Sequence, residues 1–382
     1  MNEINSPNKK RHYAESYFSN KLIDVKKGLE GNDIIERCSP ERFLYNLIPG
    51  QSDESNHLFL SNIDEIKNIE FIHDNGSHEK LTEIFDIIKI IGRGSFGVVV
   101  EVFHKRYNKQ AACKIVKKNK IEDEEIDFTK KLNHPNLIHL YDCFSNDDYY
   151  FLCLDLMEGG SLKSMIVNRY KSGTFFKESE IATIMRGIIS GLDFMHNLKI
   201  VHRDIKPENI MFQYKDNLES VKIGDFGLSR RVEGRSAVYG GTLVYMAPEQ
   251  LFGMKYSSNI DMWACGFMLY IMCSGGMHPI ITDNNMLYQE KYVEGMRRVK
   301  ERGWIVTPQF PELAWNLFTK LCRYDSSFRY ESYFANVHPW ITRMVSDIPE
   351  TIKEKSEKNK KTEYFKEVIV YNVDVVYLYF FE

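Results

Sequence analysis

Apolar and polar positions divide the chain into a β-prone part followed by a helical part. Between residues 85 and 118, runs of β-branched and other apolar residues are interrupted by a glycine-rich turn and by a polar turn at 104–110. This pattern predicts three antiparallel strands. Residues 122–132 then predict a helix with one apolar side. Residues 137–144 and 149–157 predict two further strands.

Paired glycines at Gly159 and Gly160 mark the change from strands to helices. Beyond them, three long segments predict helices at 179–198, 258–276 and 311–322. The expected fold is therefore α+β and bilobal. A small antiparallel β-rich N-lobe with one key helix is joined through a hinge to a larger, mainly helical C-lobe. The pattern contains no internal repeat.

The two ends of the chain differ in texture from its centre. Residues 1–82 are polar and mixed in charge and carry no chemical motif, so they predict either a partly helical or a disordered extension. Lysine and glutamate dominate residues 345–364, as in a solvated helix or linker. The predicted organisation is an N-terminal extension at 1–82, a central domain at 83–341 (N-lobe 83–156, hinge 155–160, C-lobe 160–341) and a C-terminal tail at 342–382.

Composition narrows the class of protein further. The chain has 382 residues and a net charge of −3, so no global field favours nucleic acid or an acidic membrane. Its seven cysteines include no C-x-x-C pair, which argues against a zinc site or a disulfide framework and favours a reducing compartment. The N-terminus lacks the apolar centre of a signal peptide, and no apolar run reaches the ~18 residues of a membrane span. We expect a soluble, cytoplasmic protein, with the nucleus as the alternative.

Glycine spacing near residue 92 supplies the first chemical signal. Gly92, Gly94 and Gly97 fit G-x-G-x-x-G. Glycines let a backbone approach phosphate closely and offer its N–H groups as donors. A dinucleotide-binding turn would lead into a helix, whereas this turn leads into another strand. The pattern therefore favours a glycine-rich hairpin over phosphate, with an ordinary tight hairpin as the alternative.

Lys114 lies inside the apolar strand segment that follows this hairpin. A lysine in such a strand usually points to solvent. Glu125, however, lies on the next predicted helix at the offset needed for an ion pair. Such a pair could fix the ammonium group against anionic phosphates.

Residues 201–210, VHRDIKPENI, place six polar side chains among apolar ones. Unpaired polar groups are costly to bury, so a core strand cannot hold this segment. Val201, Ile205 and Ile210 would instead anchor a loop whose polar side chains converge on one point.

Four side chains in and after this loop have the chemistry of a phosphoryl-transfer site. Asp204 can accept a proton from an attacking hydroxyl, and Lys206 can neutralise a transferring phosphoryl group. Asn209 offers an amide oxygen, and Asp225 offers a hard carboxylate of the kind that Mg²⁺ prefers. Each alone is more commonly a surface residue, but together in this order they indicate an active site.

At these residues the chain resembles the eukaryotic protein kinases, over about residues 83–341. The match consists of G-x-G-x-x-G-x-V at 92–99, A-x-K ending at Lys114, HRDIKPEN at 202–209, DFG at 225–227, APE at 247–249, DMWACG at 261–266 and Arg329 before HPW at 338–340. The later helical segments are most similar to the calcium/calmodulin-dependent group. Lys206 together with Thr242 resembles the serine/threonine type.

The resemblance implies a serine/threonine protein kinase that uses ATP and Mg²⁺ and acts on protein substrates. The implied catalytic residues are Asp204 as the base, Lys206, Lys114 and Glu125, and the implied metal ligands are Asn209 and Asp225. The implied nucleotide site consists of Ile91, Gly92, Gly94, Ser95, Phe96, Gly97, Val99, Ala112, Lys114, Leu154, Asp155, Met157 and Met211.

Roles within the nucleotide site follow from the same resemblance. Val99, Ala112 and Met211 would sandwich the adenine. Leu154 would be the gatekeeper, ahead of the hinge residues 155–157.

The activation segment departs from the kinase pattern at Val238, four residues before Thr242, where many relatives have a phosphorylatable residue. Arg203 therefore lacks its usual phosphate partner. Its candidate partners are a phosphate on Ser236, a phosphate on Tyr239 or the carboxylate of Glu233. Ser236 is the favoured phosphosite, because its neighbours are small and polar and are expected to be exposed. The expected behaviour is basal activity without modification, raised by phosphorylation of Ser236.

Further departures affect alignment and substrate preference. Thr129 stands where an apolar residue usually stacks toward Phe226. Ser161 and Ile271 stand where kinases that prefer basic substrates often have glutamate. Glu208 therefore has little acidic company, and we expect a relaxed need for arginine near the acceptor.

Two rival functions are weaker than this interpretation. A pseudokinase scaffold is disfavoured because the whole catalytic set is present, and a kinase for small molecules is disfavoured by the full APE segment. No EF-hand loop occurs, so direct calcium binding is not expected. Residues 353–361 contain many glutamates and few apolar anchors, which favours a solvated linker over a calmodulin-binding helix.

Overall fold

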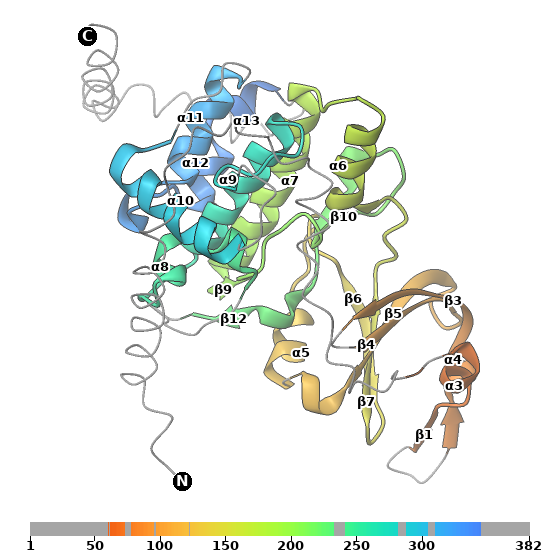
Figure 1. The fold of residues 1–382 in the computed structure, drawn as a ribbon. Helices are drawn as coiled ribbons and strands as arrows, with labels where there is room; N and C mark the ends of the chain where they lie inside the picture. The colour runs from red at the N-terminus through yellow and green to blue at the C-terminus, as the bar shows by residue number, and fades with distance from the viewer. Residues whose placement is uncertain are drawn as a thin grey trace, which may run out of the picture.

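The computed structural model describes residues 60, 62–72, 78–94, 97–121, 123–232, 241–281, 288–304 and 310–344. These residues form two lobes, with strands concentrated in the first and helices in the second (Figure 1). The α+β bilobal fold predicted from the sequence is confirmed. None of the helices in these ranges is long and apolar enough to cross a membrane.

A five-stranded antiparallel sheet forms the N-lobe, with strand order β3-β4-β5-β7-β6. Its strands are β3 (Phe85–Gly94), β4 (Gly97–His104), β5 (Lys109–Lys117), β6 (Leu140–Ser145) and β7 (Tyr149–Leu154). The five strands predicted from the apolar runs are therefore present.

Helix α5 (Asp123–Thr129) lies against one face of this sheet (Figure 1). The sequence predicted a helix at 122–132, so the observed helix ends three residues early. The N–H groups of Lys131 and Leu132 bond to carbonyls three residues back. This tightened last turn replaces the α-helical bonds that the apolar pattern predicted.

Burial alternates along β4. Val98, Val100 and Val102 are buried on one face of the sheet. Val99 and Glu101 line the cavity between the lobes on the other face. Because the apolar face is fully buried as well, the sheet is covered on both sides.

Residues 62–72 and 78–84 cover the face of the sheet opposite α5 (Figure 1). They form α3 (Ile63–Lys67), the paired strands β1 (Glu70–Ile72) and β2 (His78–Lys80), and α4 (Leu81–Ile84). Ile66, Phe71 and Leu81 are buried in the same hydrophobic cluster as Val100 and Phe151 of the sheet. The part of the predicted extension that the structure describes thus belongs to the packing of the N-lobe.

Two long helices, α7 (Glu178–Asn197) and α9 (Asn259–Cys273), pack against each other in the C-lobe (Figure 1). With α11 (Glu312–Leu321), they confirm the three helices predicted at 179–198, 258–276 and 311–322, to within three residues at each end. The other helices are α6 (Leu162–Lys171), α8 (Pro248–Leu251), α10 (Tyr288–Arg302), α12 (Ser332–Asn336) and α13 (Pro339–Met344). The short C-lobe strands are β8 (Gly160–Ser161), β9 (Ile200–Val201), β10 (Ile210–Phe212), β11 (Val221–Ile223) and β12 (Arg230–Arg231).

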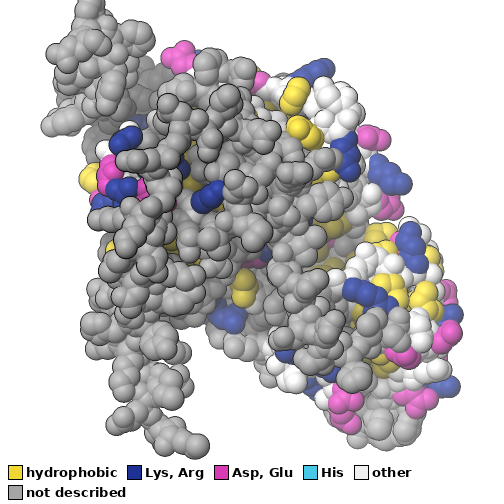
Figure 2. Space-filling model, viewed as in Figure 1, with side chains coloured by type: hydrophobic (Ala, Val, Ile, Leu, Met, Phe, Trp, Pro, Cys, Tyr) yellow, Lys and Arg dark blue, Asp and Glu magenta, His cyan; other side chains and the backbone are white. Residues whose placement is uncertain are grey.

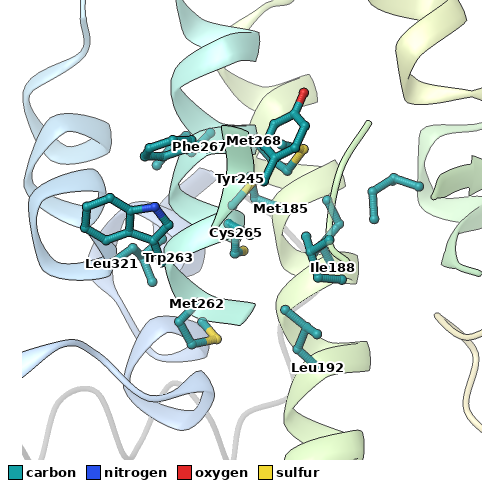
Figure 3. Packing of buried hydrophobic residues seen from close by; sticks show 14 of the residues in the cluster. Met185, Ile188, Leu192, Tyr245, Met262, Trp263, Cys265, Phe267, Met268 and Leu321 are labelled. Atoms are coloured by element: carbon teal, nitrogen blue, oxygen red, sulfur yellow. The ribbon is translucent and has the colours of Figure 1, made fainter. Parts of the chain in front are cut away.

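Helix α9 is apolar around most of its circumference, as expected for a helix at the centre of a lobe. Met185, Ile188 and Leu192 of α7 lie on one side of it (Figure 3). Trp263 of α9 lies with Leu321 of α11 on the other side (Figure 3). All five side chains are fully buried. This core is the rigid support for the loops described below.

Charged side chains of both signs are interspersed over the N-lobe face that is turned to the viewer in Figure 2, among hydrophobic ones. This mixture agrees with the small net charge of −3. The described atoms of that face therefore present no field of a single sign.

A buried ion pair joins α8 to the segment before α12. The Arg329 guanidinium donates to both carboxylate oxygens of Glu249, from Nη1 to Oε1 at 2.5 Å and from Nη2 to Oε2 at 2.9 Å. It also donates to the carbonyl oxygens of Asn259 and Arg323. Both partners of the ion pair are almost completely buried. The bidentate geometry and the extra hydrogen bonds are what a buried charge pair requires.

Arg329→Ala should lower the free energy of unfolding by about 3–5 kcal/mol, because it leaves the Glu249 carboxylate buried without a counter-charge. Urea unfolding at pH 7 measures this loss. Arg297→Ala is the control, since Arg297 pairs with Glu294 and Glu301 on the exposed surface of α10, where ion pairs contribute little. Equal destabilisation of the two variants would contradict the role given to the buried pair.

Candidate active site

The polar loop predicted at 201–210 lies between β9 and β10 of the C-lobe. Val201, Ile205 and Ile210 are buried, so apolar side chains anchor the loop as predicted. Strand β10 pairs with β11, and β9 pairs with β12. These pairings hold both ends of the loop beside the DFG segment at 225–227.

A buried carboxylate from α9 holds the backbone of this loop. Asp261 accepts the backbone N–H groups of His202 and Arg203, both at 2.8 Å, and its Oδ2 lies 2.9 Å from Nε2 of His196. Burial raises the pKa of Asp261, but the hydrogen bonds and nearby histidines outweigh it, so the pKa lies below its ordinary value. Arg203 has a φ of +73°, a left-handed conformation that is costly outside glycine. The Asp261 bonds stabilise this strained turn.

The role of Asp261 was not predicted, although DMWACG was noted as a motif. The available signal was an acidic residue inside an otherwise apolar helix. Almost fully buried aspartates need partners, and here the partners come from a loop distant in sequence.

Asp204 is the centre of a hydrogen-bond network. Its Oδ1 accepts from the backbone N–H of Thr242 at 2.9 Å and from Thr242 Oγ1 at 2.7 Å. Its Oδ2 lies 2.6 Å from Lys206 Nζ and accepts from Asn209 Nδ2 at 3.1 Å. Lys206 Nζ also donates to Thr242 Oγ1 at 2.9 Å. The structure thus brings three predicted site residues together around the hydroxyl of a threonine.

Gly241 allows Thr242 to approach Asp204 this closely. Gly241 has a φ of +110°, and a Cβ there would lie 2.4 Å from the carbonyl oxygen of Arg203. A side chain could not be accommodated without moving the backbone. The sequence shows this glycine, but its role depends on contact with a separate segment.

Lys114 and Asp225 form an ion pair, with Nζ 3.2 Å from Oδ1. The charge of Lys114 holds the pKa of Asp225 below its ordinary value, against the opposing effect of burial. The predicted partner of Lys114 was Glu125, whose side chain lies outside the described residues. That pairing stays a prediction, and the acidic partner that the structure describes is on the DFG segment.

His202 ties the DFG segment to the loop. Its Nε2 lies 3.0 Å from the carbonyl oxygen of Gly224, and its Nδ1 accepts the backbone N–H of Asp204 at 3.2 Å. These bonds fit a neutral imidazole with its proton on Nε2. The buried ring of Phe226 lies 5.7 Å from the His202 ring in an edge-to-face arrangement. Loop and DFG segment therefore form one packed unit.

Asn209 and Asp225 offer oxygen donors on adjoining backbone segments. The N–H of Gly224 donates to the carbonyl oxygen of Asn209 at 2.9 Å, which brings Asp225 next to Asn209. The amide nitrogen of Asn209 bonds to Asp204, so its amide oxygen remains available. This donor set fits Mg²⁺, which binds through one or two protein oxygens with phosphate and water. In the described ranges, no group of three or more His, Cys, Asp or Glu side chains could hold a metal by itself.

A cavity of about 830 Å³ lies between the N-lobe sheet and the C-lobe segment around Met211. This volume is typical of small-molecule sites. Ser95 and Phe96 lie outside the described residues, and Gly94 is described only as the last residue of β3. The predicted nucleotide-binding residues that line it are Ile91, Gly92, Gly97, Val99, Ala112, Lys114, Leu154, Asp155, Met157 and Met211.

The carboxylate of Asp155 is bonded to other protein groups. It is buried, accepts the backbone N–H of His139 at 3.0 Å and the hydroxyl of Tyr141, and pairs with Lys222 at 3.2 Å. Its backbone N–H also donates to the carbonyl oxygen of His139 at 3.1 Å, so the backbone carbonyl remains as the part of Asp155 that can meet a ligand in the cavity.

Several cavity residues were missed by sequence reasoning. Lys89, Glu101 and Gln110 line the cavity from the sheet, and Lys89 pairs with Glu101 at 3.2 Å. Strand alternation could have identified Glu101, because it lies two residues after Val99 and faces the same side. Thr129, noted as a departure from the kinase pattern, is buried and also lines the cavity.

Residues expected near a substrate take unexpected roles. Ile271 is fully buried in α9, so it presents no side chain to a peptide. Ser161 caps α6 by accepting the backbone N–H of Ser164 at 3.2 Å. Glu208 pairs with Lys163, with Nζ 3.0 Å from Oε1. Glu208, which was predicted to have few acidic neighbours, is thus partly neutralised by Lys163.

The regulation expected at Ser236 lies outside the described residues, as do Val238 and Tyr239. Arg203 itself is buried, with its guanidinium 5.9 Å from the ring of Tyr256. Burial lowers the pKa of Arg203. The regulatory hypothesis stays a prediction.

Three features identify the class of this protein. They are the loop with Asp204, the lysine–aspartate pair at the cavity and the glycine-rich hairpin. The family model described as "Protein kinase domain" matches residues 85–341. The chain belongs to the protein kinase family, and the predicted resemblance to eukaryotic protein kinases is confirmed.

Individual relatives narrow the group. Calcium-dependent protein kinase 4 of Plasmodium falciparum is 34% identical over 284 residues, which cover 71% of this chain and 52% of the relative. Myosin light chain kinase A of Dictyostelium discoideum is 31% identical over 272 residues, covering 69% and 89%. Serine/threonine-protein kinase H1 homolog of Danio rerio is 30% identical over 276 residues, covering 70% and 64%. The chain spans about half the length of the calcium-dependent relative. These similarities confirm the serine/threonine type and the likeness to the calcium/calmodulin-dependent group.

His278 supports the segment that follows Thr242. Its Nε2 lies 2.9 Å from the carbonyl oxygen of Val244, and its Nδ1 accepts the backbone N–H groups of Ile280 and Ile281, each at 3.1 Å. Burial lowers the pKa of His278 to about 3. The imidazole is therefore neutral in the folded protein at physiological pH.

Acidification from pH 7 to pH 5 should destabilise the protein through His278. An unfolded histidine has a pKa of about 6.5, so between that value and about 3 the unfolded chain binds the extra proton. Stability therefore falls as pH falls through this window, by about 2 kcal/mol at pH 5 for this residue. Urea unfolding of the wild type and His278→Asn at both pH values measures the effect. The variant should lose less stability on acidification, and an identical loss in both proteins would contradict the assignment.

Proposed function

We propose that this protein transfers the γ-phosphoryl group of ATP to serine or threonine hydroxyls of protein substrates. The observation that carries the proposal is the contact between Asp204 and the hydroxyl of Thr242 at 2.7 Å, with Lys206 Nζ 2.9 Å from the same oxygen. A substrate hydroxyl placed in this way would have a carboxylate to accept its proton and an ammonium group beside the transferring phosphoryl group.

The cavity supports binding of ATP next to this centre. Val99 and Ala112 of the sheet and Met211 of the C-lobe are proposed to enclose the adenine ring from opposite sides. The backbone carbonyl of Asp155 and the backbone of Met157 are proposed to form hydrogen bonds with its edge. This arrangement leaves the phosphates toward Lys114 and Asp225, which also line the cavity.

Lys114, Asn209 and Asp225 are proposed to meet the phosphates. Mg²⁺, when bound, supplies charge neutralisation and orientation of the γ-phosphoryl group. The chain itself fixes the ligands, because Lys114 holds the Asp225 carboxylate and Asp204 orients the Asn209 amide. Glu125 is proposed as the partner that Lys114 takes when Asp225 binds the metal. Leu154, which lines the cavity at the end of β7, is proposed as the gatekeeper.

The scaffold alternative finds no support in the described residues. Asp204, Lys206 and Asn209 form one network, and Lys114 pairs with Asp225 at the cavity. A nucleotide-binding scaffold would need neither the network nor its contact with a hydroxyl. We therefore propose an active kinase with a role in cytoplasmic or nuclear signalling.

Calcium enters the comparison through the name of one relative. The calcium-dependent name belongs to a relative of which this chain spans 52%. No EF-hand loop occurs within these 382 residues. We propose that these residues bind no calcium directly and that residues 353–361 are a linker rather than a calmodulin-binding helix.

Asp204→Asn should lower kcat about 10²–10⁴-fold and leave the dissociation constant of the nucleotide nearly unchanged, because Asp204 faces the acceptor hydroxyl. Asp225→Asn should weaken Mg²⁺-dependent nucleotide binding, because Asp225 lines the cavity. Peptide phosphorylation and titration with a fluorescent ATP analogue, with and without Mg²⁺, measure the two effects.

Equal loss of nucleotide affinity in the two variants would contradict this division of roles. Wild-type protein that binds nucleotide but transfers no phosphate to any peptide or to itself would establish the scaffold instead.

The ion pair between Lys163 and Glu208 allows a second test, of substrate preference. Glu208 is the residue before Asn209 in the loop of the site. Lys163→Ala should free the carboxylate and raise kcat/KM for peptides with arginine before the acceptor, relative to neutral peptides, by about threefold for a partly exposed pair. A peptide array with wild type and variant measures the ratio. Lys163→Ala combined with Glu208→Gln is the control and should show no rise. A strong arginine requirement in the wild type would overturn this explanation.

A further inference from the structure

One face of the N-lobe sheet borders the cavity, and the other face is apolar. On β4 and β5, Val98, Val100, Cys113 and Ile115 are almost completely buried on the face away from the cavity. Antiparallel sheets commonly leave one face to solvent, so this face has a dedicated cover. The cover is the cap segment, which we define as Leu60, residues 62–72 and residues 78–84.

Side chains of the cap segment enter the core of the sheet. Ile66 and Leu81 are fully buried, and both belong to the hydrophobic cluster of β4, β5 and β7. The ring of Phe71 lies 5.1 Å from Phe144 in β6 and 4.8 Å from Phe151 in β7, edge to face in both cases. The cap segment therefore packs on the sheet as a core element and not as a loose extension.

Hydrogen bonds also join the cap segment to the turn of each hairpin in the sheet. The donors come from the β6–β7 turn, the β4–β5 turn and the glycine-rich β3–β4 hairpin. The bonds run from Asn146 Nδ2 to the Glu70 carbonyl at 3.2 Å, from Lys105 Nζ to the Thr82 carbonyl at 2.8 Å and from Arg93 Nη1 to the Leu60 carbonyl at 2.8 Å.

Arg93 links the cap segment to the nucleotide site. Arg93 is opposite Val98 in the register, so both side chains leave the sheet on the cap face. The next pair, Gly92 and Val99, lines the cavity, and Arg93 borders the cavity as well. A shift of the Arg93 backbone would therefore move the residues that border the cavity.

We propose that the cap segment is a fixed part of the catalytic N-lobe and that its hydrogen bond with Arg93 positions the glycine-rich hairpin over the nucleotide. Arg93 is assigned as a positioning residue, because its guanidinium bonds to the Leu60 carbonyl of the cap segment while its backbone borders the cavity. The effect on nucleotide affinity rests on the proposed use of ATP, whereas docking of the cap segment is testable without activity. The matched kinase family model begins at residue 85 and does not include this cover.

Docking is tested in the full chain with Phe71→Ala. Cys113 and Cys153 are fully buried and directly opposite each other in β5 and β7, so a pulse of a thiol reagent followed by peptide mapping reports opening of the capped face. Their labelling rate should rise at least about tenfold, while buried Cys265 of the C-lobe should label at the wild-type rate. Phe328→Ala, at a 73% exposed position, is the matched control and should change neither rate.

Positioning is tested with Arg93→Ala at a temperature well below unfolding. The dissociation constant of a fluorescent ATP analogue and KM for ATP should rise about twofold to tenfold, as for loss of one hydrogen bond, and kcat should stay within about twofold. Arg93→Lys should restore part of the affinity, because lysine can also donate to a carbonyl. Arg106→Ala, an exposed arginine in the β4–β5 turn, is the charge-matched control.

Two results would overturn the inference. Wild-type labelling of Cys113 and Cys153 in Phe71→Ala would show that the cap segment does not cover the sheet in solution. Lower thermal stability of Arg93→Ala with unchanged nucleotide affinity would show a structural role only. Wild type that binds nucleotide without transferring phosphate would refute the proposed function, and the affinity comparison would still decide the role of Arg93.

Discussion

The Asp261 carboxylate is the constraint on which the candidate active site depends. Its bonds to the backbone of His202 and Arg203 hold the loop in a conformation that the chain would otherwise avoid. With those two residues fixed, His202 can bond to both Gly224 and the backbone of Asp204. The loop and the DFG segment are thereby placed by a group that neither lines the cavity nor bonds to the Thr242 hydroxyl. Rigid placement before the reaction is what electrostatic catalysis requires.

Above this support, each polar side chain of the site serves more than one segment. Asp204 bonds to Lys206 and Asn209 in its own loop and to Thr242 in the segment before APE at 247–249. Lys114 connects the N-lobe sheet to Asp225 in the C-lobe. Charged residues at one site therefore both connect the two lobes and hold the loop in place. Such shared hydrogen bonds make the contribution of a single residue hard to separate from that of its neighbours.

Much of the fold could be predicted because its elements are long and regular. The strands of the sheet and the helices α7, α9 and α11 carry clear periodicity, and the motif residues follow one another in a recognisable order. The cap segment was not predicted as a core element, because α3 has five residues and β1 has three, too few for a period to be read.

The remaining failures share a second cause, which is contact between segments distant in sequence. The Asp155 carboxylate reaches Lys222, and Glu208 in the loop between β9 and β10 reaches Lys163 of α6. The local sequence does not predict which partner a charged side chain pairs with in the fold. The chemistry of the site could thus be predicted from residue types and their order. Which charged side chains pair with each other could be learned only from the fold.

The two-sided burial of β4 and β5 has a consequence for how strands find their partners during folding. Val99 is opposite Lys114, on the cavity side, whereas Val100 is opposite Cys113, on the covered side. Side chains alternate with a period of two, so a shift of one residue would exchange the faces of a whole strand. Such a slip would bury the Lys114 ammonium among apolar side chains, at a high cost in free energy. Lys114, which pairs with Asp225, therefore also disfavours the sheet with the shifted register. The same residue contributes to the site and to the correct pairing of the strands.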